Sequence, residues 1–250
     1  MEKIELKHCM DLDANDPLRE LRSEFLLAET GSIHFDANSM GAMPKTVPEK
    51  VAWMLNEGWR NLGRQGWSKL DWIDQPKKLG NGIAHLLGAQ SEDVVVCDNT
   101  SINLHKLISY AWGIKNSGNI LLTESNHFPT DVYIAEGWIK SLKNYGVDAE
   151  IRFADSHEQL LDCLDENVAV VNVSYVDYRT SLRWDMGRLM QKAQEVGALV
   201  VWDLSHAAGA VEIDLMGNDA DFAVGCGYKY LCGGPGAPAY LFIHPKHRYK

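Results

Sequence analysis

Apolar residues fall in short continuous runs along most of this chain, and segments with a helical spacing of apolar residues separate those runs. Continuous apolar runs of this length are typical of strands that helices cover on both faces. The runs that predict strands are 93–98, 119–125, 149–154, 167–175 and 198–206.

Four segments of helical periodicity alternate with these runs, at 101–115, 130–146, 156–165 and 185–197. A regular alternation of strand and helix favours a parallel sheet between two layers of helices. We therefore predict the α/β class, with a three-layer αβα arrangement around a mostly parallel central sheet.

The first 90 residues follow a different pattern. Residues 15–29 show apolar positions at helical spacing, with Asp16 suited to the N-cap and Pro17 to the first helical position, so a helix is predicted there. A short strand that leads into a polar, glycine-ended loop is predicted at 32–41. The other elements predicted in this part are helices at 45–61 and 71–88, with an aromatic and basic loop at 62–70 between them.

Length and composition set the number of domains. The chain has 250 residues, of which 46% are hydrophobic, and this is enough to bury the full core of one large domain. No internal repeat, low-complexity segment or Pro/Ser linker divides it. We predict an N-terminal helical segment at 1–30 and one large domain at 31–250.

Charge and cysteine content restrict the partners and the compartment. The formal net charge is -10 and the basic residues are scattered, so no nucleic-acid partner is expected. The N-terminus lacks the apolar core of a signal peptide, and no stretch approaches the roughly 18 to 20 apolar residues of a membrane span. Five cysteines without a CxxC pair are typical of free thiols in a reducing compartment. A cytoplasmic protein without membrane contact is predicted.

Polar residues directly after the apolar runs are the candidates for chemistry, because ligands of open α/β sheets bind beyond the carboxyl ends of the strands. Thr100 and Ser101 follow the first run and begin a helix. Free backbone N–H groups, two hydroxyls and the helix dipole make a site for a phosphate there. The alternative is that Asn99 or Thr100 only caps the helix.

An aromatic residue and an acidic one follow two further runs. Phe128 is suited to stack on a flat ring, although a Phe packed under a loop is the commoner case. Asp203 ends its run and His206 follows three residues later. The pair lacks a third and fourth ligand at suitable spacing, so no metal is predicted. A carboxylate there suits a protonated ring nitrogen, and a structural Asp–His pair is the alternative.

Lys229 follows a further apolar run, at 222–227, and stands between Tyr228 and Tyr230. Glycines lie on both sides of it. A lysine near a low-dielectric pocket loses proton affinity and becomes a nucleophilic amine, and the glycines allow backbone and cofactor to approach closely. The four strand ends together offer a phosphate site, a stacking ring, a carboxylate for a ring nitrogen and an amine for an aldehyde. These are the requirements of pyridoxal 5'-phosphate, which we predict as the cofactor.

The same segments resemble, in order and spacing, the successive motifs of the kynureninase family, whose members are fold-type I pyridoxal-phosphate hydrolases. The resemblance extends from about residue 30 to the end of the chain and implies the large domain of that fold. The segments are FDANSMGAMP, DNTSINLHKL, HFPTDVY, VSYVDYRTS, WDLSHAAGAVEIDL and ADFAVGCGYKYLCGGPGAP.

The resemblance implies roles for individual residues. Lys229 would form the Schiff base, Asp203 would pair with the pyridine nitrogen, and Tyr228 would donate or accept a proton. Ser39 would line the substrate pocket. The residues implied to hold the cofactor are Thr100, Ser101, Phe128, Asp131, Ser174, Asp203, His206, Tyr228 and Lys229.

The implied reaction is the hydrolysis of L-kynurenine, or of its 3-hydroxy form, to anthranilate (or 3-hydroxyanthranilate) and L-alanine, a step of tryptophan catabolism. A homodimer is the family's usual assembly. The family also continues into a smaller C-terminal domain, which the resemblance implies is absent from these 250 residues.

Two other functions stay open on the sequence alone. One is a relative of the cysteine desulfurases or selenocysteine lyases, which share the fold and the lysine chemistry. The other is a non-catalytic remnant that binds pyridoxal phosphate or packs against a partner subunit.

Overall fold

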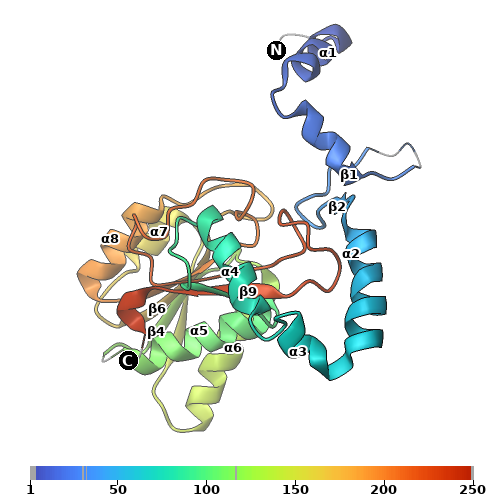
Figure 1. The fold of residues 1–250 in the computed structure, drawn as a ribbon. Coiled ribbons are helices and arrows are strands. Elements are labelled where there is room, and N and C mark those ends of the chain that lie inside the picture. Colours follow the sequence, from blue (N-terminus) through green and yellow to red (C-terminus); the bar gives the residue numbers. More distant parts are fainter. Residues whose placement is uncertain (1–3, 30, 32, 116, 249–250) are drawn as a thin grey trace.

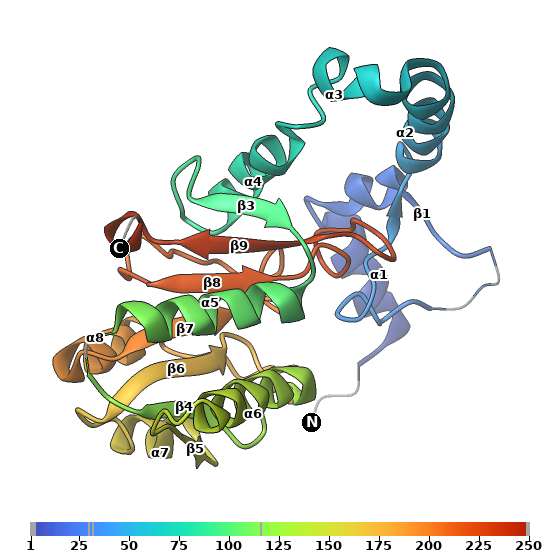
Figure 2. The same ribbon diagram turned by 90° about the horizontal axis from the view of Figure 1, so that it is seen from below.

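The computed structural model describes residues 4–29, 31, 33–115 and 117–248, and its centre is a seven-stranded sheet (Figures 1 and 2). The strands lie in the order β3-β9-β8-β7-β6-β4-β5. β9 is antiparallel to both of its neighbours and the other pairs are parallel, which confirms the predicted α/β class with a mostly parallel sheet. The strands are β3 (Val94–Cys97), β4 (Ile120–Glu124), β5 (Glu150–Ala154), β6 (Val168–Ser174), β7 (Leu199–Asp203), β8 (Phe222–Gly225) and β9 (Ala239–Ile243).

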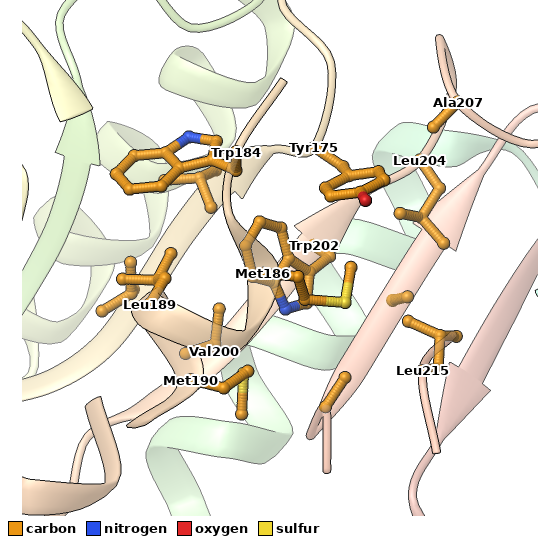
Figure 3. Close-up of a cluster of buried hydrophobic side chains, with 14 of the residues drawn as sticks. Tyr175, Trp184, Met186, Leu189, Met190, Val200, Trp202, Leu204, Ala207 and Leu215 are labelled. Carbon is orange, nitrogen blue, oxygen red and sulfur yellow. The ribbon is translucent and has the colours of Figure 1, made fainter. Parts of the chain in front are cut away.

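Successive residues of a strand point to opposite sides, so both faces of this sheet carry apolar side chains. Helices cover both faces. On β4 and β7, Leu121 and Val201 belong to the apolar cluster under α5 (Thr100–Ile114) and α6 (Pro129–Asn144). Their neighbours Leu122 and Trp202 belong to the opposite cluster, shown in part in Figure 3. The helices on that side are α4 (Gln75–Leu86), α7 (His157–Asp162) and α8 (Met186–Val196).

Helix α4 packs closely on β3, and Gly80 lies at the crossing. A Cβ atom on Gly80 would stand 2.1 Å from the carbonyl oxygen of Val94, whereas a Cβ atom on Gly82 would meet nothing within 4 Å. We expect Gly80→Ala to lower the free energy of unfolding by about 1–3 kcal/mol through overpacking. Gly82→Ala, the matched control, is expected to raise it by up to about 1 kcal/mol through helix propensity. Urea unfolding measures both, and equal stabilities of the two variants would contradict the close packing.

The helix predicted at 15–29 is wrong. Residues 19–24 form 3-10 turns (η1, Arg19–Glu24), and the next residues form strand β1 (Phe25–Leu26), paired with β2 (Met43–Pro44). The Asp16 carboxylate accepts from the backbone N–H of Leu18 at 2.8 Å and closes a turn instead of capping an α-helix. Neither η1 nor α1 (Leu6–Asn15), which was not predicted, buries a residue, so local bonds and strand pairing decide this part.

The short strand predicted at the start of 32–41 is not observed, whereas the polar loop predicted after it is. Residues 33–36 have no regular structure, and turns and a bend follow at 37–40. Ile33 and Phe35 are 80% and 90% exposed, so no burial favours an extended strand there. The short strand β2 begins only at Met43.

The next helices extend away from the sheet (Figure 1). The helix predicted at 45–61 is confirmed as α2 (Val47–Trp53), which continues into π-type turns at η2 (Met54–Leu62). The loop predicted at 62–70 is partly helical, with η3 (Gly63–Gln65) and α3 (Gly66–Lys69). A last 3-10 turn, η4, spans Pro245–His247. Across the described residues, every helix is too short or too polar to cross a membrane.

Candidate functional site

The carboxyl ends of β3 and β8 meet at the first residues of β9. Because β9 runs antiparallel to both, Ala239 lies opposite Cys97 and Tyr240 lies opposite Gly225. The backbone N–H of Ala239 also donates to the carbonyl oxygen of Asp98 at 3.0 Å. The sheet thereby brings the start of α5 and the loop that carries Lys229 to one edge.

Lys229 is 7% exposed and lies among three of the predicted residues. Its Nζ is 2.8 Å from Nε2 of His206. It also lies 5.6 Å from the ring centroid of Phe128 and 5.7 Å from that of Tyr228. Burial, followed by the charge of Lys229, lowers the pKa of His206, so a neutral imidazole accepts a hydrogen bond from the amine.

Two glycines allow the backbone to pack tightly around this lysine. The N–H of Gly41 donates to the carbonyl oxygen of Tyr228 at 3.0 Å, and a Cβ atom on Gly41 would stand 2.1 Å from the carbonyl oxygen of Lys229. A Cβ atom on Gly227 would stand 2.5 Å from the carbonyl oxygen of Pro238. The loop of residues 37–41 is thus held against the loop that carries Lys229.

Asp203 is buried at the end of β7 and is already oriented. One carboxylate oxygen accepts from the backbone N–H of Ser205 at 2.9 Å, and the other accepts from Oγ of Ser174 at 3.3 Å. Both bonds fix the orientation of the carboxylate. The predicted residues Ser174 and Asp203 therefore lie together, on adjacent strands β6 and β7.

A second buried carboxyl group lies near Asp203. Oδ2 of Asp131 is 3.7 Å from Nε2 of His127, and neither atom has a hydrogen-bond partner among the described residues. Burial, followed by the charge of Asp203, raises the pKa of Asp131 well above its ordinary value. Burial likewise lowers the pKa of His127. Unpartnered buried polar atoms of this kind are expected where a polar ligand completes the site.

The start of α5 lies at the other side of the site. The Asn99 side chain accepts from the backbone N–H of Ile102 at 2.9 Å and caps the helix. Asn99, not Thr100, is therefore the N-cap of α5. Thr100 and Ser101 lie in the first turn of the helix and are half-buried. A 15-residue helix presents its N–H groups and positive dipole end there.

A cavity of about 540 Å³ lies beside Lys229. Ser39 is exposed, and the residues of its loop that line this cavity are Ala37 and Asn38. Tyr178, which the sequence analysis left unassigned, contacts the Phe128 ring edge-on with centroids 5.1 Å apart. Tyr178 lies in the polar segment that follows the carboxyl end of β6, and this position could have marked it as a candidate site residue. The lining of the cavity includes Ala37, Asn38, Tyr178, Arg179, His206 and Tyr230.

The donor set fits pyridoxal phosphate. A buried amine, a buried oriented carboxylate, unpartnered polar atoms at His127 and Asp131, and a helix N-terminus lie at one edge of the sheet. Among the described residues, no cluster of three or more His, Cys, Asp and Glu side chains is arranged as a metal site.

Comparison with known proteins identifies the family. Residues 33–242 match the family model "Aminotransferase class-V". The chain belongs to this family. It is 41% identical to a kynureninase of Pseudomonas fluorescens over 242 residues, which are 95% of this chain and 57% of that protein. A kynureninase of Burkholderia mallei is 38% identical over 246 residues, covering 97% of this chain and 58% of that protein.

The fold agrees with this family assignment. A cysteine desulfurase of Escherichia coli superposes with a TM-score of 0.74 at 16% identity, covering 91% of this chain and 58% of that one. A likeness at this identity shows the shared fold alone. The chain spans somewhat less than three-fifths of the length of the curated relatives that it matches.

Proposed function

We propose that this chain is the cofactor-binding part of a kynureninase, which binds pyridoxal 5'-phosphate and hydrolyses L-kynurenine or its 3-hydroxy form. The observation that carries the proposal is the buried Lys229 amine, held by His206 and bordered by the rings of Phe128 and Tyr228. The 41% identity to a kynureninase supports this substrate class over that of the desulfurases, which share only the fold.

The predicted residues divide between the parts of the cofactor. Lys229 would attach to the aldehyde carbon, and Asp203, with both oxygens already oriented, would hold a proton on the pyridine nitrogen. Phe128 would lie against the ring. The remaining contacts would come from Thr100, Ser101 and Tyr228 at the phosphate and from Asp131, Ser174 and His206 around the ring.

When bound, pyridoxal phosphate supplies an electron-poor ring that stabilises negative charge on the substrate carbons next to the amine. Lys229 would take the α-proton of the substrate and return it, because its Nζ is buried at the point where the substrate amine must arrive. The neutral His206 beside it accepts a hydrogen bond from Nζ and so orients the amine. Water adds to the γ-carbonyl, and cleavage of the Cβ–Cγ bond leaves anthranilate and L-alanine.

A two-step measurement tests the proposal. The purified chain is titrated with pyridoxal phosphate, and the visible absorption of the lysine-bound cofactor is expected to appear and saturate. L-Kynurenine is then added, and anthranilate release is followed by its fluorescence. Absence of the band overturns the cofactor assignment. A band without anthranilate release supports the non-catalytic alternative for these 250 residues.

The finer assignments belong to the same proposal. We place residues 31–250 in the large domain and residues 1–30 in an N-terminal segment, of which 1–3 and 30 lie outside the described residues. The five free thiols fit a reducing, cytoplasmic compartment. Exposed apolar side chains on the N-terminal elements, such as Leu6, Met10 and Leu18, fit burial against a second copy in a homodimer.

A further inference from the structure

A second group of polar and aromatic side chains lies beside the Lys229 site and has no role in the chemistry described so far. Glu124 ends β4, and its Oε2 accepts a hydrogen bond from Nε1 of Trp184 at 3.4 Å. Its Oε1 lies 3.4 Å from Nε2 of His157 at the start of α7. The His157 and Trp184 rings are stacked, with centroids 3.7 Å apart and an interplanar angle of 22°. We call these three residues the Glu124 cluster.

The Glu124 cluster joins two segments that border the Lys229 site. One is 124–128, which leads from Glu124 to Phe128. The other is 175–184, which folds back on itself, since the N–H of Trp184 donates to the carbonyl oxygen of Tyr175 at 3.0 Å. Val176 and Arg183 also form an antiparallel bridge. The second segment is therefore a closed loop, and Trp184 lies at its base, paired with Tyr175.

The same two segments meet again next to Lys229. Arg179 donates to Oδ1 of Asn126 at 2.9 Å, and the Tyr178 ring lies edge-on to the Phe128 ring at 5.1 Å. Tyr178 is also 6.2 Å from the His206 ring. Movement at the Glu124 cluster would therefore shift Phe128, whose ring centroid lies 5.6 Å from the Lys229 amine, and Tyr178, which contacts that ring.

Burial of Glu124 makes this contact sensitive to pH. Its side chain is only 16% exposed, and burial, with a further contribution from Asp177, raises its pKa to about 7, although the Trp184 hydrogen bond opposes the shift. Protonated Glu124 can donate to Nε2 of His157, whereas the carboxylate requires His157 to present an N–H. The other charged groups that line the adjoining cavity are Asp155, Glu158, Asp177 and Arg179.

We propose that Glu124 is a positioning residue, which acts through Trp184 and the 175–184 loop to set the places of Phe128 and Tyr178 beside Lys229. The proposal rests on the proposed function only for its effect on the cofactor. The link between Glu124 and the loop belongs to the protein itself and can be tested without any ligand.

The cofactor-free test follows near-ultraviolet circular dichroism from pH 5.5 to 8.5, which reports the packing of the aromatic pairs. Wild-type protein is expected to show a change centred near the Glu124 pKa of about 7. Glu124→Gln keeps a hydrogen-bonding side chain of the same shape but cannot titrate, so the change should disappear. Glu166→Gln is the matched control, since Glu166 is exposed and outside the cluster, and it should behave as wild type.

Two further measurements use Glu124→Ala, which removes both contacts. Hydrogen exchange of the amides at 176–183 in the cofactor-free protein should become faster than in Glu166→Gln. Affinity for pyridoxal phosphate should fall about tenfold, as expected from losing one hydrogen bond to a charged group. If Glu124→Ala does not fold, Trp184→Phe, which keeps the stacked ring and loses the N–H donor, replaces it with the same expected direction.

The proposal is overturned if Glu124→Gln retains the pH-dependent change, or if exchange at 176–183 is the same in Glu124→Ala and the control. Unchanged cofactor affinity in Glu124→Ala also overturns it. If the wild-type chain binds no pyridoxal phosphate, the proposed function fails, and the two cofactor-free measurements still decide whether Glu124 positions the loop.

Discussion

Lys229→Ala is expected to eliminate covalent attachment of pyridoxal 5'-phosphate to this chain. The Nζ of Lys229 is the amine held by His206 at 2.8 Å between the rings of Phe128 and Tyr228, and alanine leaves no amine there. The visible absorption of the lysine-bound cofactor should vanish. Reduction with borohydride followed by peptide mass analysis should find no labelled peptide around residue 229.

The fold should survive this substitution. Lys229 is 7% exposed and forms no ion pair with a carboxylate among the described residues, so its removal breaks no direct salt bridge. Lys143→Ala, an exposed lysine on α6, is the control and should retain full attachment. A labelled peptide that persists in Lys229→Ala would assign the attachment to another lysine and would contradict the proposed site.

Trp202→Ala is expected to cause the largest loss of stability. Trp202 is fully buried on β7 and contacts Tyr175 edge-on with centroids 5.8 Å apart, in the cluster that Figure 3 shows. Its truncation should lower the free energy of unfolding by about 3–5 kcal/mol, from lost burial and the cavity that remains. Chemical unfolding of the cofactor-free protein measures this change.

Trp202→Phe separates packing from hydrogen bonding at the same position. Nε1 of Trp202 has no hydrogen-bond partner among the described residues, so the phenyl ring removes an unsatisfied donor while it keeps most of the apolar contact. We expect a loss of about 1 kcal/mol, well below that of alanine. Equal losses for Phe and Ala would mean that ring packing is not what stabilises this side of the sheet.

The apolar runs predicted strands β3 to β7 correctly, together with the helices between them. The strand predicted at 167–175 is observed as β6, and all seven of its residues are buried. Such runs leave one arrangement that buries them, a strand between two helical layers. The prediction failed for the helix at 15–29 and for the short strand at the start of 32–41, where little is buried and turn hydrogen bonds or short strand pairing decide the conformation.

Candidate site residues were found from their place after strand ends, since that rule follows from topology alone. It identified Asp203 and Lys229, but not the contact between Lys229 and His206 or the unpartnered pair His127 and Asp131. Those depend on how loops from different strands approach each other. Glu124 was missed although it ends β4, because nothing in a single sequence shows that Trp184, 60 residues later, donates to it.

The sequence by itself determined the α/β class, the positions of the strand ends and the chemical groups they offer, because these follow from local periodicity and residue type. Only the tertiary structure decided which groups meet. The antiparallel β9 between β3 and β8 brings the first turn of α5 to the edge that carries Lys229. Burial then sets the protonation of His206 and Glu124, since desolvation depends on neighbours far apart in the chain.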